Sequence, residues 1–431
     1  MESLSKYFSF RERNTNLKTE LIAGLTTFLA MMYIVIVNPS VYSIAGMDFG
    51  GVYVATIIAT VFATLIMGVA ANYPIAIAPG LGINAYLVFN VVLGQGVSWQ
   101  QALGAAAVAS GIFTLLSLTT FREMFINSIP ESLKKAIAAG IGLFIALIGF
   151  RGGHIVIPSE GTMITLGDLS DPVLILTIVG LVFTMILVSR NVTGAIFFGM
   201  LFTALLSGIF GYLQFPESVV ALPGGFENTF MQLSFEDMPS LSMIIFTVLL
   251  VTLFDTTGTM LGVGQQAGLI KDGHFPNLKS ALIADSLGSF VGAFSGTGPT
   301  STYVESGTGV SAGGRTGFAS VVTAILFVAL LFFQPLAAAI SALPQVTAPA
   351  LILTGCFMVA DMANINWQDY TEAFPAFLTM VLMPFTYSIT NGVGMGMITY
   401  VILKICSGKM KEVHPLLIIM AILFAAQLIN S

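Results

Sequence analysis

Two stretches of sequence decide the fold: NYPIAIAPGLGINAY, residues 72–86, and GTGPTSTYVESGTGVSAGGRTG, residues 296–317. Proline and glycine interrupt both stretches, although both lie within apolar regions. Proline lacks the N–H that a helix needs, and glycine weakens a helix by about 1 kcal/mol relative to alanine. Irregular backbone survives at membrane depth only where it is buried in protein or lines a cavity. Two such segments at corresponding places of a chain indicate the binding site of a secondary transporter.

The composition around these stretches is that of a membrane protein. Of the 431 residues, 56% are hydrophobic and 8% are charged, whereas a soluble domain carries about 25% charged residues. The apolar runs do not alternate with polar residues, which excludes a closed β-barrel. Cys356 and Cys406 form neither a disulfide framework nor a metal-ligand pattern. No metal and no cofactor is therefore expected.

The apolar runs predict fourteen membrane spans, each needing about 20 residues, and one terminal segment. The spans are expected at 20–38, 52–71, 75–93, 101–120, 133–150, 172–188, 194–213, 241–264, 279–296, 299–314, 316–333, 346–360, 374–391 and 393–407. The terminal segment, 414–430, is compatible with crossing the membrane and with lying at its surface.

Basic residues predict the orientation of the chain. They gather in the N-terminal tail and in the loops after spans four, six, eight and ten, which all lie on one side. These residues are Lys6, Arg11, Arg13, Lys18, Arg122, Lys134, Lys135, Arg190, Lys271, Lys279 and Arg315. Loop 214–240 on the other side has no Lys or Arg, and Arg151 is the main exception. The positive-inside rule therefore predicts a multi-pass protein of the cytoplasmic membrane with a cytoplasmic N-terminus.

The two broken stretches belong to an internal repeat. Residues 55–74 align without gaps with residues 280–299, at an offset of 225 (299 − 74), and this offset also pairs span one with span eight. Further on, residues 128–130 pair with residues 342–344 at an offset of 214 (344 − 130). Each repeat holds seven spans, and seven is odd, so the second copy enters from the opposite side. The predicted fold is an all-α polytopic protein with a seven-plus-seven inverted repeat.

The broken spans three and ten are expected to contain short strands and half-helices. Thr300 to Val304 is rich in β-prone residues and follows a proline. It predicts a short strand before a half-helix that starts near Glu305, crossing a partner strand at Pro74 to Ala78. The N-termini of the half-helices would then direct partial positive charge at the site.

Three carboxylates interrupt the apolar spans: Asp255, Asp285 and Glu305. A charge at mid-membrane costs about 2.5–3.5 kcal/mol even on the lenient insertion scale, so such residues are functional candidates. Asp255 and Glu305 are predicted to bind substrate, and Asp255 is also predicted to carry the coupling proton. Asp285 is predicted to make a structural polar contact between helices.

Three uncharged residues complete the predicted binding site. Thr259 lies one helical turn after Asp255, and Asn84, in the broken span three, can both donate and accept hydrogen bonds. Tyr303 precedes Glu305 by two residues and shares its face if the backbone is extended. An aromatic ring, an amide and two carboxylates suit a flat, uncharged heterocycle with N–H donors.

These residues carry a resemblance to a known family. The stretches NTNLKTELIAGLTTFLAMMYIVIVNP, APGLGINAY, LFDTTGTMLGV, STYVESGTGVSAGGRTG and NWQDYTEAFPAFLTMVLMPFTYSITNG are similar to the adenine/guanine/hypoxanthine permease branch of the nucleobase:cation symporter family. The similarity runs from Asn14 to about Lys411. It implies a uracil-permease-like fold, proton-coupled uptake of purine nucleobases, and a homodimer in the lipid bilayer.

The resemblance also implies a division into domains. A core domain would hold spans 1–4 (residues 14–124) and spans 8–11 (residues 237–334). A gate domain would hold spans 5–7 (residues 125–236) and spans 12–14 (residues 335–412). Residues 413–431 would form a short terminal apolar segment.

The resemblance implies roles for single residues as well. In the wider family, an acidic residue in span eight and a glutamate in span ten bind the base, and Asp255 and Glu305 hold these places. Asn84 matches a functional asparagine of this branch. Ser306 and Thr259 depart from the ascorbate and uracil branches, which argues against uracil, xanthine or ascorbate as substrate. Guanine and hypoxanthine are therefore the first expected substrates, and adenine the second.

Two other functions fit the sequence less well. An anion transporter or channel of the same inverted-repeat fold would favour a cation or bare half-helix dipoles over two carboxylates. An intramembrane aspartyl protease using Asp255 and Asp285 would give no reason for the broken spans. The expected protein is a transporter rather than an enzyme, and no nucleic acid partner is expected.

Overall fold

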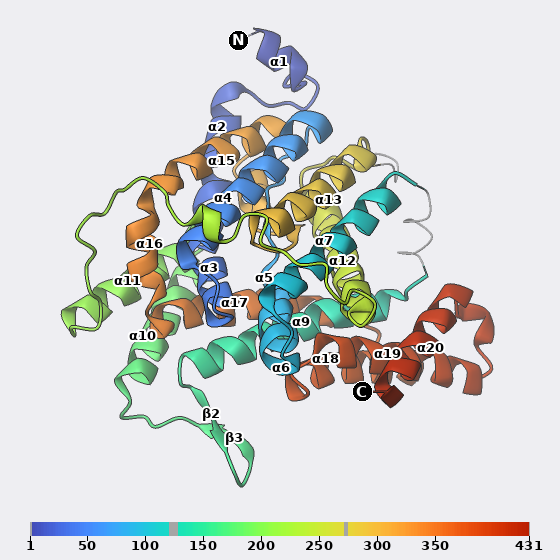
Figure 1. Ribbon diagram of the computed structural model, residues 1–431. Coiled ribbons are helices and arrows are strands. Elements are labelled where there is room, and N and C mark those ends of the chain that lie inside the picture. The colour runs from blue at the N-terminus through green and yellow to red at the C-terminus, as the bar shows by residue number, and fades with distance from the viewer. Residues whose placement is uncertain (1, 120–127, 271–274, 431) are drawn as a thin grey trace.

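The computed structural model describes residues 2–119, 128–270 and 275–430. Arg122, Lys271 and the expected domain boundary at 124/125 lie outside these residues. The described chain is mostly helical (Figure 1). Within it, nine helices are long and apolar enough to cross a membrane, and three shorter apolar helices accompany them. The chain is thus a multi-pass membrane protein.

The helices follow the predicted spans closely. In the first half they are α2 (Leu17–Met31), α3 (Ile34–Ile44), α4 (Phe49–Ile66), α7 (Trp99–Ser117), α9 (Glu131–Gly152), α10 (Pro172–Ser189) and α11 (Ala195–Ile209). In the second half they are α12 (Ser242–Gln266), α13 (Leu278–Ser295), α15 (Gly317–Leu330), α16 (Gln334–Ser341), α17 (Pro344–Val359), α18 (Tyr370–Phe385), α19 (Ile389–Cys406) and α20 (Pro415–Asn430). A short helix, α1 (Glu2–Tyr7), precedes them.

Three features differ from the expected boundaries. Span one, expected at 20–38, extends over residues 17–44 and breaks at residues 32–33, between α2 and α3. Asn16 begins it earlier than apolarity suggests, because its side chain accepts from the Thr19 N–H and caps the helix. Span eleven continues through α16 to Ser341. The loop after α9 forms an unpredicted hairpin of β2 (Val156–Ser159) and β3 (Met163–Leu166).

Each broken span has the expected short strand before a half-helix, although the first strand begins at Ile77 rather than at Pro74. Span three consists of β1 (Ile77–Pro79), α5 (Leu81–Ala85) and a π-helical continuation, Tyr86–Val92. Span ten consists of β4 (Thr300–Thr302) and α14 (Ser306–Ser311). The two strands pair antiparallel, with Ile77 opposite Thr302. Both strands are fully buried, so the two halves of the molecule meet through backbone hydrogen bonds at its centre.

The structure also bears out the offset of the repeat. The first residues of α2 and α12 are 225 apart (242 − 17), as are the first residues of α5 and α14 (306 − 81). The paired residues Ile77 and Thr302 have the same separation (302 − 77). Two equivalent residues can face each other in an antiparallel pair only on a two-fold axis, so the axis that relates the repeats passes through this pair.

Helices of the two repeats pack against each other. In Figure 1 the blue helix α4 lies beside α13 and α15, and α9 lies against α17 and α18. Glycine makes the approach of α9 and α17 possible: a Cβ added to Gly142 would lie 2.6 Å from the carbonyl oxygen of Gly355. Pro130 and Pro344, the pair at offset 214, stand directly before α9 and at the first residue of α17.

The terminal segment lies lengthwise along α19. Phe424, near the middle of α20, packs on Gly394 in the first turns of α19, and its ring lies 5.6 Å from that of Phe246 near the start of α12. Lys404, near the other end of α19, pairs with Glu412 just before α20. Helix α20 therefore runs antiparallel to α19 over most of its length.

Candidate functional site

Three of the predicted site residues come together where the broken spans cross. Asp255 is near the middle of α12, and its carboxyl lies close to Ser301 on β4. Tyr303 and Glu305 follow β4 directly. Tyr303 is close enough to interact electrostatically with both carboxylates, and the two carboxylates interact with each other. The site thus holds two acids and one aromatic ring.

The first broken span fixes the Tyr303 ring. The Tyr303 N–H donates to the carbonyl oxygen of Ala76 (3.0 Å), and its hydroxyl donates to the carbonyl oxygen of Pro79 (2.7 Å). Both acceptors belong to the backbone at β1. The ring is 6% exposed and held at both ends, so it presents a rigid apolar face.

Glu305 is held at the N-terminal end of α14, where it is the N-cap residue. Its Oε1 accepts a hydrogen bond of 2.7 Å from the hydroxyl of Tyr33. Tyr33 is fully buried at the break between α2 and α3. The sequence analysis did not identify Tyr33, because it is uncharged. The repeat offers a clue to it, because the offset of 225 pairs Tyr33 with Gly258 (33 + 225), which lies between Asp255 and Thr259.

The structure places Asn84 in a separate polar network. Asn84 is fully buried on α5, and its amide donates to Asn38 Oδ1 (2.9 Å) and to the carbonyl oxygen of Thr297 (3.1 Å). Asn38 in turn donates to Thr56 (2.8 Å) and to the Thr297 hydroxyl (2.6 Å). This network links α3, α4, α5 and the segment before β4. The role of Asn84 in substrate binding stays a prediction.

The other two candidates lie on either side of Asp255. Thr259, one turn further along α12, is partly exposed. Asp285 on α13 is fully buried, and its Oδ2 accepts from the hydroxyl of Thr256 (2.6 Å). Asp285 thus makes a polar contact between α12 and α13, of the structural kind expected for it.

Exposure differs among the residues around the site. In the C-terminal half of α12, Gly258 and Leu261 are exposed, and Val304 is 55% exposed. In the first broken span, the Tyr86 hydroxyl lies 2.9 Å from that of Thr390, at the start of α19, and both residues are buried.

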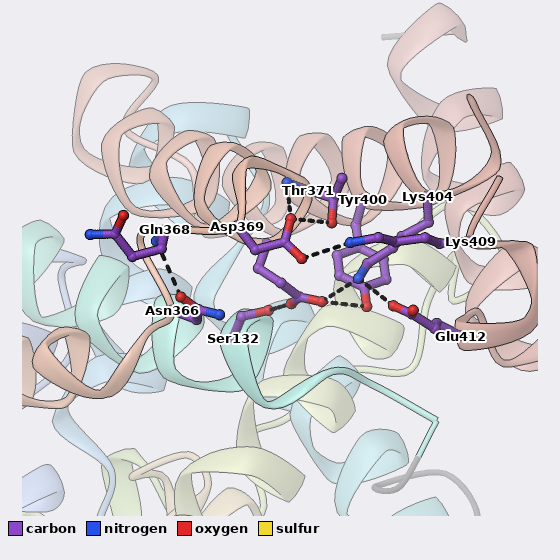
Figure 2. Close-up of polar contacts among 10 residues, drawn as sticks. Ser132, Asn366, Gln368, Asp369, Thr371, Tyr400, Lys404, Lys409 and Glu412 are labelled. Atoms are coloured by element: carbon purple, nitrogen blue, oxygen red, sulfur yellow. Dashed lines mark hydrogen bonds and ion pairs between the residues drawn. The ribbon is translucent and has the colours of Figure 1, made fainter. Parts of the chain in front are cut away.

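A polar cavity of about 410 Å³ lies at the start of α9 and α18 and the end of α19 (Figure 2). Its centre is Lys404, whose side chain is 2% exposed and whose Nζ pairs with Glu372 Oε1 (2.6 Å) and Glu412 Oε2 (2.7 Å). Tyr400 and Ser132 also donate to the Glu372 carboxylate. Lys404 thereby ties α18, α19 and the turn before α20 together, which is a structural task.

The same cavity holds a capping carboxylate. Asp369 accepts from the N–H of Thr371 (2.9 Å) at the start of α18 and pairs with Lys409 Nζ (2.9 Å), as Figure 2 shows. The hydrogen bonds from Lys409 and Thr371 hold the pKa of Asp369 well below its usual range. Within the described residues, no group of three or more His, Cys, Asp or Glu side chains could hold a metal ion.

Comparison with solved structures supports the same fold. The transmembrane domain of the cyanobacterial bicarbonate transporter BicA superposes with a TM-score of 0.64, covering 88% of this chain and 97% of that domain at 13% identity. The anion transporter SLC26A9 gives a TM-score of 0.64, covering 90% of this chain and 66% of that protein, also at 13% identity. At this identity the likeness concerns the uracil-permease-like inverted-repeat fold.

Comparison of sequences identifies the family. The chain is 47% identical to the guanine/hypoxanthine permease PbuO of Bacillus subtilis, over 98% of this chain and 99% of the relative. It is 40% identical to the adenine permease AdeQ of Escherichia coli, over 99% and 96% of the two chains. The model of the permease family Xan_ur_permease matches residues 18–395. With the crossed broken spans and the paired carboxylates, these matches show that the chain belongs to this permease family and to its adenine/guanine/hypoxanthine branch.

Proposed function

We propose that this protein carries purine nucleobases into the cell through the site formed by Asp255, Tyr303 and Glu305. Guanine and hypoxanthine are the first expected substrates, and adenine the second. The observation that carries the proposal is the meeting of two carboxylates and a fixed aromatic ring at the crossing of the broken spans. The names of the relatives, guanine/hypoxanthine and adenine permeases, agree with this choice.

The chemistry of the site suits a purine. A purine base is flat and uncharged and carries N–H donors along its edge. Carboxylates accept such hydrogen bonds, and bonds to charged groups contribute about 1.5–3 kcal/mol each. The rigid face of Tyr303 offers a surface for stacking the ring system, as aromatic pairs prefer. Thr259, one turn from Asp255, adds a partly exposed hydroxyl.

Asp255 is the proposed proton carrier. Its place near the middle of α12 makes a permanent charge costly within the membrane. Protonation would neutralise the carboxyl and allow the loaded site to pass from one side to the other. One proton that moves down a potential of 100 mV supplies about 2.3 kcal/mol, which supports roughly 50-fold accumulation.

The proposed movement is alternating access between two rigid domains. Helices of the proposed core domain, residues 14–124 and 237–334, pack on each other, as α2 does on α15. Helices of the proposed gate domain, residues 125–236 and 335–412, do the same, as α9 does on α17. The terminal segment, residues 413–431, adds α20 to the gate domain. A homodimer with a cytoplasmic N-terminus completes the proposal.

Uptake of radiolabelled hypoxanthine into liposomes tests this function. With the purified protein and an outside pH below the inside pH, we expect concentrative uptake that unlabelled guanine competes away and uracil does not. Dissipating the pH and voltage gradients should leave only equilibration. Uptake of radiolabelled bicarbonate without any purine uptake would instead support the anion transporter. Accumulation of hypoxanthine that persists after both gradients are dissipated would contradict the proposed symporter.

A further inference from the structure

Tyr33 joins the first repeat to the proposed binding site in the second. It lies at the break of span one, with its main chain at the N-terminal end of α3. Its side chain is fully buried, and its hydroxyl donates to Glu305 Oε1 over 2.7 Å. The two residues are 272 positions apart in sequence. The bond therefore forms only when both repeats are in place.

This hydrogen bond restricts the Glu305 side chain. A hydrogen bond with one ionised partner is shorter and stronger than one between neutral groups, and it is directional. Glu305 stands at the first turn of α14 and is only partly buried, so its carboxylate has room to rotate. The fully buried tyrosine ring has no such freedom. Tyr33 thus fixes Oε1 and leaves Oε2 directed away from the bond.

The repeat shows that this contact has no counterpart in the other half. The equivalent of Tyr33 is Gly258 (33 + 225), and the equivalent of Glu305 is Gly80 (305 − 225). A symmetric copy of the contact would therefore join two glycines, which have no side chains. A Cβ added to Gly258 would meet no atom within 4 Å. The place that a tyrosine fills on one side of the axis is thus open space on the other.

We propose that Tyr33 is a positioning residue that orients Glu305, so that Oε2 accepts from the substrate while the base occupies the space over Gly258. The choice of a purine as that substrate rests on the proposed function above. The positioning itself rests on the hydrogen bond, the burial of Tyr33 and the asymmetry of the repeat.

The test compares two buried tyrosines of the same span. Tyr33→Phe removes the hydroxyl that contacts Glu305, and we expect hypoxanthine binding to weaken about 10-fold. Tyr42→Phe is the matched control: Tyr42 lies on α3, is 2% exposed, and its hydroxyl has no hydrogen-bond partner among the described residues. The affinity of the Tyr42→Phe variant for hypoxanthine should stay within about twofold of wild type, because this substitution removes no hydrogen bond.

A double-mutant cycle separates positioning from packing. If Tyr33 acts through Glu305, adding Tyr33→Phe to Glu305→Gln should change affinity by less than about twofold. A loss of the same size in both backgrounds would assign Tyr33 a packing role and overturn the proposal. Wild-type affinity in folded Tyr33→Phe would overturn it as well.

A spectroscopic measurement tests the contact without any substrate. The infrared difference between wild type and Glu305→Gln isolates the carboxylate stretch of Glu305. Tyr33→Phe should shift this band, and Tyr42→Phe should not. A shifted band in a protein that binds no purine would retain the positioning and reject the purine function. An unshifted band would reject the positioning whatever the substrate.

Discussion

The two broken spans begin with the same backbone elements, a short strand and a half-helix, but carry different side chains. Half-helices α5 and α14 begin at equivalent residues, and β1 and β4 pair across the axis. Yet the positions equivalent to Tyr303 and Glu305 are Ala78 (303 − 225) and Gly80 (305 − 225). Span ten thus carries an aromatic ring and a carboxylate where span three carries almost no side chain.

Spans one and eight differ in the same way. Asp255 on α12 is equivalent to Ala30 on α2 (255 − 225). The repeat therefore provides a symmetric frame, and the second copy provides the acids. A purine has no two-fold symmetry, so a site that binds it needs different side chains on its two sides. The first repeat contributes backbone acceptors, such as the carbonyl group that holds Tyr303, and the hydroxyl of Tyr33.

The largest expected effect is at Asp255. Asp255→Asn keeps the shape of the side chain and removes its ability to bind and release a proton. We expect concentrative hypoxanthine uptake to be abolished, while exchange of purine across the membrane can persist. The measurement is accumulation in liposomes under a pH gradient of defined size.

Ala30→Ser is the matched control for Asp255→Asn at the equivalent place in span one. It is a small change at a buried position, 7% exposed, and should retain accumulation. Normal accumulation and normal pH response in Asp255→Asn would remove the acid from the mechanism. Loss of accumulation in both Asp255→Asn and Ala30→Ser would show that accumulation depends on this position in both repeats, and not on the acid in the second repeat alone.

The next effect is at Glu305, compared with Gly80. Glu305→Gln replaces an ionised acceptor by a neutral one, and hydrogen bonds to charged groups contribute about 1.5–3 kcal/mol. Binding of hypoxanthine to the inserted protein should therefore weaken about 10- to 150-fold. A Cβ on Gly80 would meet only side-chain atoms, Ser301 Oγ at 3.1 Å and Ile83 Cγ2 at 3.2 Å. Gly80→Ala should then cost about fivefold or less. Equal losses of affinity in Glu305→Gln and Gly80→Ala would contradict the inference that span ten, and not span three, supplies the side chain that binds the base.

A smaller effect is expected in thiol labelling, which asks which span faces the substrate. The exposed Cys356 and Cys406 are first replaced by serine. Gly258→Cys, in open space next to Asp255, should react with a small thiol reagent, and hypoxanthine should slow the reaction severalfold. Asn84→Cys, at a fully buried position, should react slowly with or without purine.

Gln95→Cys serves as the exposed control for labelling, because Gln95 lies at the end of span three, away from the crossing. Its labelling should be fast and independent of purine. Purine protection of Asn84→Cys would show that span three also contributes a side chain to the substrate. That result would support the role predicted for Asn84 from sequence and weaken the asymmetry between the halves.

The sequence predicted the frame because its signals are local. Proline and glycine interrupt a helix wherever they stand, so spans three and ten were identifiable without any contact information. Carboxylates in apolar spans are costly, so Asp255 and Glu305 stood out. The strands pair because both broken segments leave backbone groups that must be satisfied within the membrane.

The missed features depend on contacts between distant segments. From the sequence, Tyr33 is indistinguishable from an ordinary core residue. Only its hydrogen bond to Glu305, 272 positions away, indicates a role at the site. The ion cluster around Lys404 joins residues from α9 to the turn before α20, which no local pattern relates. The break at residues 32–33 contains neither proline nor glycine, so periodicity alone predicted one continuous helix there.

The smallest expected effect concerns the two halves of the proposed gate domain, whose second helices, α10 and α18, both start with a capping aspartate. Asp171 caps α10 and pairs with His154 (2.6 Å), and Asp369 caps α18 and pairs with Lys409 (2.9 Å). The hydrogen bond from His154, with that from the Val173 N–H, lowers the pKa of Asp171. Hydrogen bonds from Lys409 and Thr371 lower the pKa of Asp369 further.

A lowered pKa in the folded state means that the unfolded state binds protons first as the pH falls. The stability from each carboxylate is therefore complete well above the ordinary aspartate pKa of about 3.9 and declines below it. Thermal unfolding of Asp369→Asn in detergent should show a melting temperature a few degrees below wild type at pH 7, with the difference shrinking toward pH 3. A difference for Asp369→Asn that is constant from pH 3 to pH 8 would assign its effect to packing rather than to charge.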